Sequence, residues 1–156
     1  MTNNYYIRPS KKDDCYKLSK TMRKDDVQEV FASSGSNPAQ ALINAYLSSH
    51  RHCYSIVLED EVVGMFGINR VNENVGIPWL MGSDKLTMHK MEFYKKSIEH
   101  LNTFMDEYNV LFNYVDKRNW QAIRWLKGLG FTFTKLVSEY GYEKKPFYEF
   151  IKARYV

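Results

Sequence analysis

Apolar and polar positions along the chain follow two different spacings, and each change of spacing predicts a new element. Runs rich in β-branched and aromatic residues predict strands at 5–8, 53–58, 62–68, 75–81, 110–115, 131–134 and 147–152. Apolar residues three and four apart predict helices at 10–22, 25–32, 38–49, 88–108 and 119–130. This order predicts an α/β protein with a mixed, twisted sheet and helices on both faces.

The longest predicted helix, at 88–108, has the clearest apolar stripe. The stripe consists of Met91, Tyr94, Ile98, Leu101, Met105 and Tyr108. We expect this face to pack onto the sheet. In the strand before it, Pro78 has no backbone N–H, so we expect Pro78 at a bulge or at an unpaired strand edge. Asn37 before Pro38 predicts the capped start of an earlier helix.

The stretch at 119–131 has both ends of a short helix marked. Asn119 is a good N-cap, because its side-chain oxygen accepts a hydrogen bond from a free amide of the first turn. Gly130 stands where a helix ends in a left-handed turn. The predicted buried face consists of Ala122, Ile123 and Leu126.

A strand, a capped helix, a glycine turn and a second strand in this order resemble motif B of the GNAT N-acetyltransferase superfamily. In that motif an Asn opens the helix, an Ala follows three residues later and a Gly-Phe pair closes it. Here these residues are Asn119, Ala122, Gly130 and Phe131. The strings at 111–119, 123–126 and 78–84 also resemble small GNAT-like proteins of podophages, some of which are internal virion proteins.

The resemblance implies one GNAT-like domain at 1–156, with a mostly antiparallel sheet in which two central strands splay apart. The splay falls between the strands at 75–81 and 110–115. In this fold the pantetheine arm of acyl-CoA lies in the splay. The resemblance therefore implies acetyl-CoA as co-substrate and direct transfer of its acetyl group to an amine, carried by a protein or by a small molecule.

The turn into the long helix departs from the family. GNAT proteins carry a Gln/Arg-x-x-Gly-x-Gly/Ala loop there, whereas the segment at 81–90 has one glycine. A helix N-terminus suits a pyrophosphate, although an ordinary capped helix start explains the same residues. The resemblance implies that acyl-CoA contacts this turn and the helix of motif B. The implied contact residues are Leu80, Met81, Gly82, Ser83, Lys85 and Lys90 in the turn, and Asn119, Ala122, Trp125 and Leu126 in the helix.

The position of the usual general acid also departs from the family. A Tyr seven residues after the helix-opening Asn often protonates the leaving thiolate, and this chain has Leu126 there. Tyr114, Tyr140 and Tyr142 are alternative donors, and we favour Tyr114. The family holds the thioester carbonyl with a backbone amide of the cleft strand, which corresponds to 80–82.

An N-acetyltransferase also needs a base that removes a proton from the attacking ammonium. The candidate residues are Glu59, Glu73, Asp84, His89 and Asp116. Each also suits a solvated turn or a helix cap. We favour Asp84 and His89 as catalytic residues, because they flank the end of the proposed cleft strand.

Composition narrows the function further. With 44% hydrophobic and 26% charged residues, the 156-residue chain is typical of a globular domain. Its net charge of +4 is too small to indicate a dedicated nucleic-acid binder. Cys15 and Cys53 predict free core thiols. His50, His52 and Cys53 are too few for a structural zinc site, so we expect no metal.

The sequence leaves three functions open. An acetyltransferase comes first. A catalytically inactive GNAT-like virion or assembly protein of a phage comes second, favoured by the loop at 81–90 and by Leu126. Nucleic-acid binding rests on charge alone. No apolar run predicts a membrane span, and no signal segment opens the chain. We expect the cytoplasm of the cell that makes it, or a virion, and leave a homodimer open.

Overall fold

The computed structural model describes residues 4–49 and 51–154. The elements, in chain order, are β1 (Tyr5–Pro9), α1 (Lys12–Ser19), α2 (Lys24–Ser34), α3 (Pro38–Ser48), β2 (Cys53–Leu58), β3 (Glu61–Arg70), β4 (Val75–Gly82), α4 (Asp84–Met88), α5 (Lys90–Glu107), β5 (Val110–Asp116), α6 (Trp120–Gly128), β6 (Thr132–Tyr140) and β7 (Lys145–Ala153). Every predicted strand is present, and β6 extends well beyond its predicted end. His50 lies outside the described residues.

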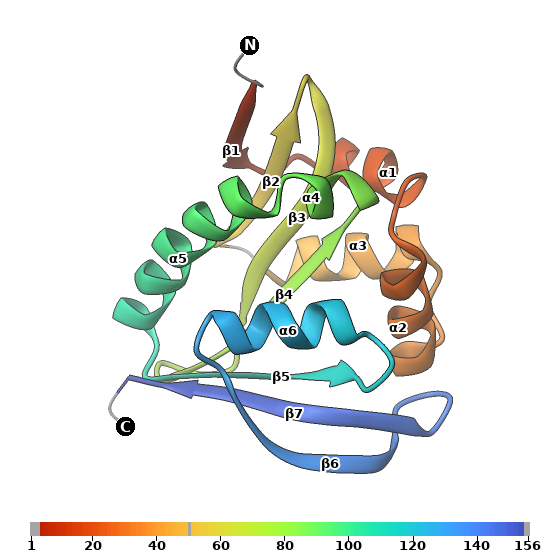
Figure 1. Ribbon diagram of the computed structural model, residues 1–156, viewed down its shortest axis with the longest axis vertical. Coiled ribbons are helices and arrows are strands. Elements are labelled where there is room, and N and C mark those ends of the chain that lie inside the picture. Colours follow the sequence, from red (N-terminus) through yellow and green to blue (C-terminus); the bar gives the residue numbers. More distant parts are fainter. Residues whose placement is uncertain (1–3, 50, 155–156) are drawn as a thin grey trace.

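The strands form one sheet in the order β1-β2-β3-β4-β5-β7-β6. All neighbouring strands are antiparallel except β4 and β5, which are parallel. Figure 1 shows α5 and α6 over one face of the sheet, with α1 and α3 behind it. The predicted mixed sheet, covered on both faces, is therefore confirmed.

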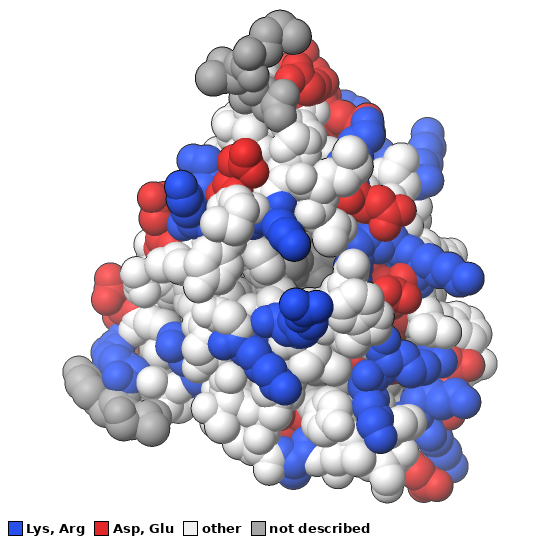
Figure 2. All heavy atoms as spheres, in the orientation of Figure 1, with Lys and Arg blue, Asp and Glu red and all other residues white. Residues whose placement is uncertain are grey.

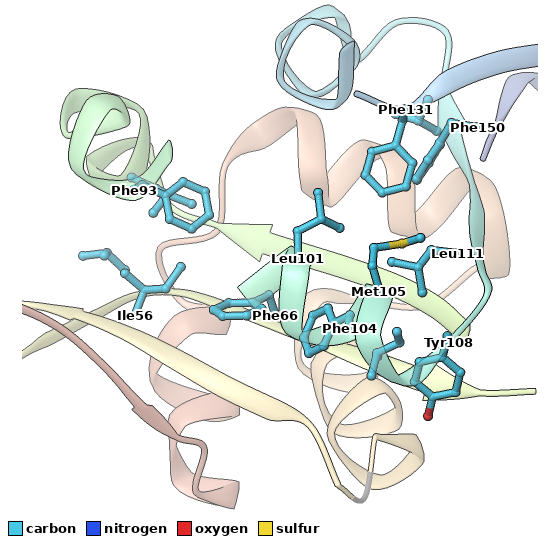
Figure 3. Close-up of a cluster of buried hydrophobic side chains, with 14 of the residues drawn as sticks. Ile56, Phe66, Phe93, Leu101, Phe104, Met105, Tyr108, Leu111, Phe131 and Phe150 are labelled. Carbon is cyan, nitrogen blue, oxygen red and sulfur yellow. The ribbon is translucent and has the colours of Figure 1, made fainter. Parts of the chain in front are cut away.

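Two apolar clusters lie on the two faces of the sheet. The larger one joins α5, α6 and the central strands, and Figure 3 shows several of its aromatic and aliphatic side chains meeting between helix and sheet. The smaller one joins α1 and α3 to β3 and contains Cys15, Leu18, Leu42 and Met65. Cys15 is a free buried thiol, and burial raises its pKa to about 11.

The long helix differs from its prediction in its start and in part of its buried face. The segment at 84–108 divides into α4 and α5, which meet at His89. The C-terminal part of the predicted stripe is buried as expected, at Leu101, Met105 and Tyr108. In the N-terminal part, Met91 is 62% exposed and Phe93 is buried instead, because burial stabilises in proportion to apolar area.

Local signals at the other helices were more reliable. Asn37 accepts a hydrogen bond from the Gln40 amide at 2.9 Å, with Pro38 at the first helical position, as predicted. Gly130 takes the predicted left-handed conformation, with φ +91°. Asn119 occupies the predicted N-cap position of α6, but the predicted capping hydrogen bond from its side chain is absent.

Candidate functional site

The centre of the sheet opens between β4 and β5. Val75 pairs with Val110 and Gly76 with Leu111, and the two strands are not paired beyond these positions. We call the gap between 77–82 of β4 and 112–116 of β5 the fork. One side chain crosses it near its base, where Asn113 Nδ2 donates to the Pro78 carbonyl at 2.8 Å.

Pro78 lies where its missing donor is tolerated. The N and O atoms of one strand residue point to the same side of the strand. Since the Pro78 carbonyl faces β5, its nitrogen also faces the fork, where no strand pairs with it. The expectation of an unpaired edge at Pro78 is thus confirmed.

Successive residues of a strand direct their backbone N–H groups to opposite sides, and this alternation places one amide of β4 inside the fork. Ser83 N donates to the Val63 carbonyl on the β3 side, whereas Gly82 N donates to Asp26 Oδ2 on the other side at 3.0 Å. The register from Gly82 to Gly76 is regular. Leu80, two residues before Gly82, therefore directs its N–H into the fork between β4 and β5.

A cleft of about 780 Å³ follows the fork across the molecule. Figure 2 shows this face hollowed near its centre, with Lys and Arg side chains beside the hollow. One end of the cleft lies between α5 and α6, and the other lies beside α2 and β6. Its lining is mainly apolar and aromatic, as in most sites for small molecules.

Helix α2 closes the wide end of the fork. Asp26 binds the Gly82 amide at the end of β4, and Glu29, one helical turn later, accepts from the Asp116 amide at the end of β5 at 2.9 Å. Arg23, just before α2, donates its backbone N–H to the Gly82 carbonyl at 2.8 Å. These three residues hold the ends of the diverging strands at a fixed separation.

Asn119 joins this group instead of capping α6. Its Oδ1 accepts from Arg23 Nη2 at 2.9 Å, and its Nδ2 donates to Glu29 Oε1 at 3.3 Å and to Asp26 Oδ1 at 3.4 Å. Arg23 also pairs with Asp26 at 3.1 Å and donates to Gln121 Oε1. We call Arg23, Asp26, Glu29 and Asn119 the α2 brace.

Burial shifts the titration of both carboxyls in the α2 brace. Burial and the charge of Asp26 raise the pKa of Glu29 from 4.5 to about 8. Burial also raises the pKa of Asp26, against the opposing charge of Arg23. Glu29 therefore loses its proton at a much higher pH than an ordinary glutamate, and carboxyls with pKa values shifted in this way are typical of functional clefts.

Aromatic side chains line both ends of the cleft. Near α2, the rings of Tyr114 and Tyr140 stack with centroids 4.7 Å apart. At the other end, Phe93 of α5 stacks on Trp125 of α6 at 4.8 Å, and the Tyr94 hydroxyl donates to the Gly128 carbonyl at 2.9 Å. These two contacts join α5 to α6 across the rim of the cleft.

The structure brings most of the sequence-predicted site residues to the cleft. The lining includes Leu80, Met81, Gly82, Lys90, Tyr114, Asn119, Ala122, Trp125 and Leu126. Ser83, Asp84, Lys85 and His89 are not part of the lining. Lys85 pairs with Glu61 at 2.9 Å, Asp84 is exposed at the start of α4, and Ser83 is buried.

The other predicted acids and bases are spread over the molecule. Asp116 pairs with Arg118 at 2.7 Å at the end of β5. Glu59 accepts from the Asn4 amide at the β2–β3 turn. Tyr142 is 66% exposed. The described residues hold no cluster of three or more side chains able to bind a metal ion.

Sequence reasoning missed Arg23, Asp26 and Glu29. Their signal was their spacing, since residues three apart share one face of a helix. A charged stripe of this kind is usually a solvated face, so it did not stand out.

Comparison with known proteins places the fold. The structure is similar to a GNAT-family acetyltransferase from Bacillus anthracis, with a TM-score of 0.72, 12% identity and coverage of 96% of this chain and 95% of that one. It is also similar to Ard1 from Thermoplasma volcanium, with a TM-score of 0.75, 12% identity and coverage of 96% and 97%. The fold is therefore that of the GNAT acetyltransferases.

A third similar structure was solved with coenzyme A. It is RimL, described as a ribosomal L7/L12 alpha-N-protein acetyltransferase in complex with coenzyme A. Its TM-score is 0.72 at 10% identity, over 98% of this chain and 95% of that one.

Comparison of the sequence with models of protein families gives a match to a phage family. Residues 71–141 match the model of a family described as "Bacteriophage T7, probable scaffold protein Gp13". The matched part holds β4, β5 and α6, and thus both sides of the fork. No curated protein matches the chain. In the described part of the chain, no helix combines the length and apolar character needed to cross a bilayer.

Proposed function

We propose that the cleft binds an acyl-CoA, with acetyl-CoA foremost, and transfers its acyl group to an amine. The observation that carries the proposal is the fork itself. Its two strands are parallel and diverge after Gly76 and Leu111, and an apolar cleft follows the gap. An elongated thioester fits such a gap, and the coenzyme A complex of RimL, which has the same fold, supports this reading.

The Leu80 amide is the proposed partner of the thioester carbonyl. It points into the fork and, unlike the neighbouring Gly82 amide, is not held by Asp26. A backbone donor fixed in place stabilises the oxyanion that develops during attack. Burial of the pantetheine arm between the strands orients the carbonyl toward the amine, and this orientation lowers the barrier further.

The proposed reaction is balanced without any further co-reactant. The amine nitrogen attacks the carbonyl carbon, a C–N bond forms, and the C–S bond breaks. The leaving sulfur takes up a proton as the free thiol of coenzyme A, and the ammonium proton passes to a base. Tyr114 remains our candidate for the acid. Its hydroxyl donates to Glu149 Oε2 at 2.9 Å, and this hydrogen bond raises its pKa.

Two cations beside the cleft are the proposed phosphate contacts. Lys90 is the first residue of α5, whose N-terminus favours anions. Arg124 of α6 lies over the Trp120 ring, 5.8 Å from its centroid. Both line the cleft. In this proposal, the side-chain charges of Lys90 and Arg124 take over the phosphate contacts that the glycine-rich loop makes in the GNAT family.

Calorimetric titration with acetyl-CoA tests the proposal. We expect micromolar binding by the wild type and about tenfold weaker binding by Lys90→Ala, the loss expected for one hydrogen bond to a charged group. Lys85→Ala is the matched control, because Lys85 is close in sequence but pairs with Glu61 outside the cleft. The absence of both heat and thermal shift at millimolar acetyl-CoA would contradict the proposal.

Two observations favour a second candidate function, an assembly role without acyl transfer. The matched phage family is described as a probable scaffold protein. In addition, the Phe93–Trp125 stack and the Tyr94–Gly128 hydrogen bond join the two helices at the rim of the cleft. In this reading the GNAT fold provides a scaffold, and acetyl-CoA gives no binding signal.

A further inference from the structure

Glu29 is positioned as a reactive group at the α2 end of the cleft. Its Oε1 accepts from the Asp116 amide at 2.9 Å and from Asn119 Nδ2 at 3.3 Å. Within the described part of the chain, both hydrogen bonds of Glu29 end on this one oxygen. The second oxygen, Oε2, thus takes no part in holding the side chain and is left to accept a proton.

The charged groups around Glu29 leave it without a direct ion-pair partner. On its own helix, Asp26 is paired with Arg23. On β5 and the turn after it, Asp116 is paired with Arg118, whose pKa is raised first by the hydrogen bond to Asp116 and to a smaller extent by the charge of Glu29. Across the cleft, β6 contributes the Tyr140 hydroxyl, whose pKa is raised by burial and then by the charge of Glu29. Among the described residues, none forms an ion pair with Glu29. A cationic ligand would supply a direct partner.

We propose that Glu29 is the general base of the transfer and that the acceptor is a primary alkylammonium bound at the end of the cleft that Glu29, Tyr114 and Tyr140 line. This inference rests on the proposed function. The Glu29 carboxylate takes one proton from the ammonium and becomes a carboxylic acid. The neutral amine then attacks the thioester, and Glu29 returns its proton to solvent.

The basicity of Glu29 suits this step. An alkylammonium with a pKa of about 10.4 protonates an ordinary Glu carboxylate with an equilibrium constant on the order of 10⁻⁶. Burial and the charge of Asp26 raise the pKa of Glu29 to about 8, which improves this constant to the order of 10⁻². A general base is most effective when its pKa lies near the working pH.

The walls of this end of the cleft suit a slim alkyl chain. Tyr114 and Tyr140 are stacked and present aromatic surface, and Phe147 lies against Tyr140 with ring centroids 4.6 Å apart. All three line the cleft with Glu29. Aromatic rings bind methylene groups and also attract a cation. A primary amine on an alkyl chain satisfies both the rings and the carboxylate.

Propylamine is the probe for the first test, which needs no catalysis. The full-length protein is labelled with ¹³C at the glutamate side-chain carboxyls, and the Glu29 signal is identified by its absence in Glu29→Gln. We expect a titration midpoint near pH 8, since burial raises the pKa of Glu29 to about that value. Saturating propylamine should lower the midpoint by about one pH unit or more. An unchanged midpoint would overturn the inference.

Transfer from acetyl-CoA to propylamine is the second test. Glu29→Gln should bind acetyl-CoA as the wild type does and lose about 100-fold or more of the transfer rate, together with the rise of rate toward pH 8. Asp25→Asn, on the same helix but outside the cleft lining, should keep both. Normal acetyl-CoA binding with full transfer by Glu29→Gln overturns this inference alone, whereas no acetyl-CoA binding overturns the proposed function.

Discussion

Replacement of Asn119 by Ser distinguishes a helix cap from a member of the α2 brace. Serine caps helices about as well as asparagine. If Asn119 stabilised α6 as a cap, Asn119→Ser would therefore change the free energy of unfolding very little. Serine is too short to reach Arg23, Glu29 and Asp26 together, so it would remove the contacts that Asn119 makes in the structure.

The contacts of Asn119 set the size of the effect. The hydrogen bond from Arg23 is short, at 2.9 Å, and the donor is charged. Such bonds contribute about 1.5–3 kcal/mol. The bonds to Glu29 and Asp26 are longer, at 3.3 and 3.4 Å, and we expect less from each. Asn119 is 2% exposed, so its loss also leaves buried partners unsatisfied. We expect Asn119→Ser to destabilise by about 2–4 kcal/mol.

Urea denaturation followed by circular dichroism measures this change directly. Asn119→Ala should lose about as much as Asn119→Ser, because neither side chain reaches the α2 brace. Asn37 provides the matched control, since its side chain does cap α3. Asn37→Ser should be nearly neutral, and Asn37→Ala should cost about 1 kcal/mol.

The comparison between the two sites decides the question. If Asn119→Ser stays within about 0.5 kcal/mol of the wild type while Asn119→Ala loses about 1 kcal/mol, Asn119 behaves as Asn37 does. That result would refute the role of Asn119 in holding the fork.

Three further predictions concern the cleft and its supports. Because burial raises the pKa of Glu29 from 4.5 to about 8, the folded state keeps a proton that the unfolded state has lost between these values. Stability should therefore fall as pH rises through this window, by about 1–3 kcal/mol from pH 6 to 8, and Glu29→Gln should flatten this decline in urea titrations at each pH. Tyr94→Phe removes the hydrogen bond to the Gly128 carbonyl across the rim, so it should cost about 1 kcal/mol in urea and speed acetyl-CoA association in stopped flow. Gly141→Ala should destabilise the protein by more than about 1 kcal/mol in thermal melts, because φ of Gly141 is +72° and a Cβ would meet the Ser33 carbonyl at 2.5 Å. Gly128→Ala is the control. Gly128 is helical and a Cβ there would only touch the Tyr94 ring, at 3.6 Å, so this variant should be neutral or more stable.

Elements fixed by neighbouring residues could be predicted from the sequence. The Asn37–Pro38 start of α3 and the left-handed turn at Gly130 both depend on interactions within a few residues. The splay between β4 and β5 was expected from the GNAT resemblance and not from the residues of the two strands.

Features that depend on distant partners could not be predicted. Arg23, Asp26 and Glu29 have the spacing of an ordinary charged helix face, and only the ends of β4 and β5 make them structural. Asn119 was misread for the same reason. A local capping role fitted its position, but its partners lie more than 85 residues earlier, at Arg23 and Glu29.

The α2 brace and the open fork have one physical origin. Backbone groups that leave a sheet ladder must find other partners when they are buried. Where β4 and β5 diverge, the Gly82 amide binds Asp26, the Asp116 amide binds Glu29, and the Pro78 carbonyl binds Asn113. Pro78 has no amide to satisfy, which leaves the Leu80 amide as the donor that still faces the gap. The fork is therefore stabilised at its base and at its end, and its middle holds a fixed donor for a carbonyl oxygen.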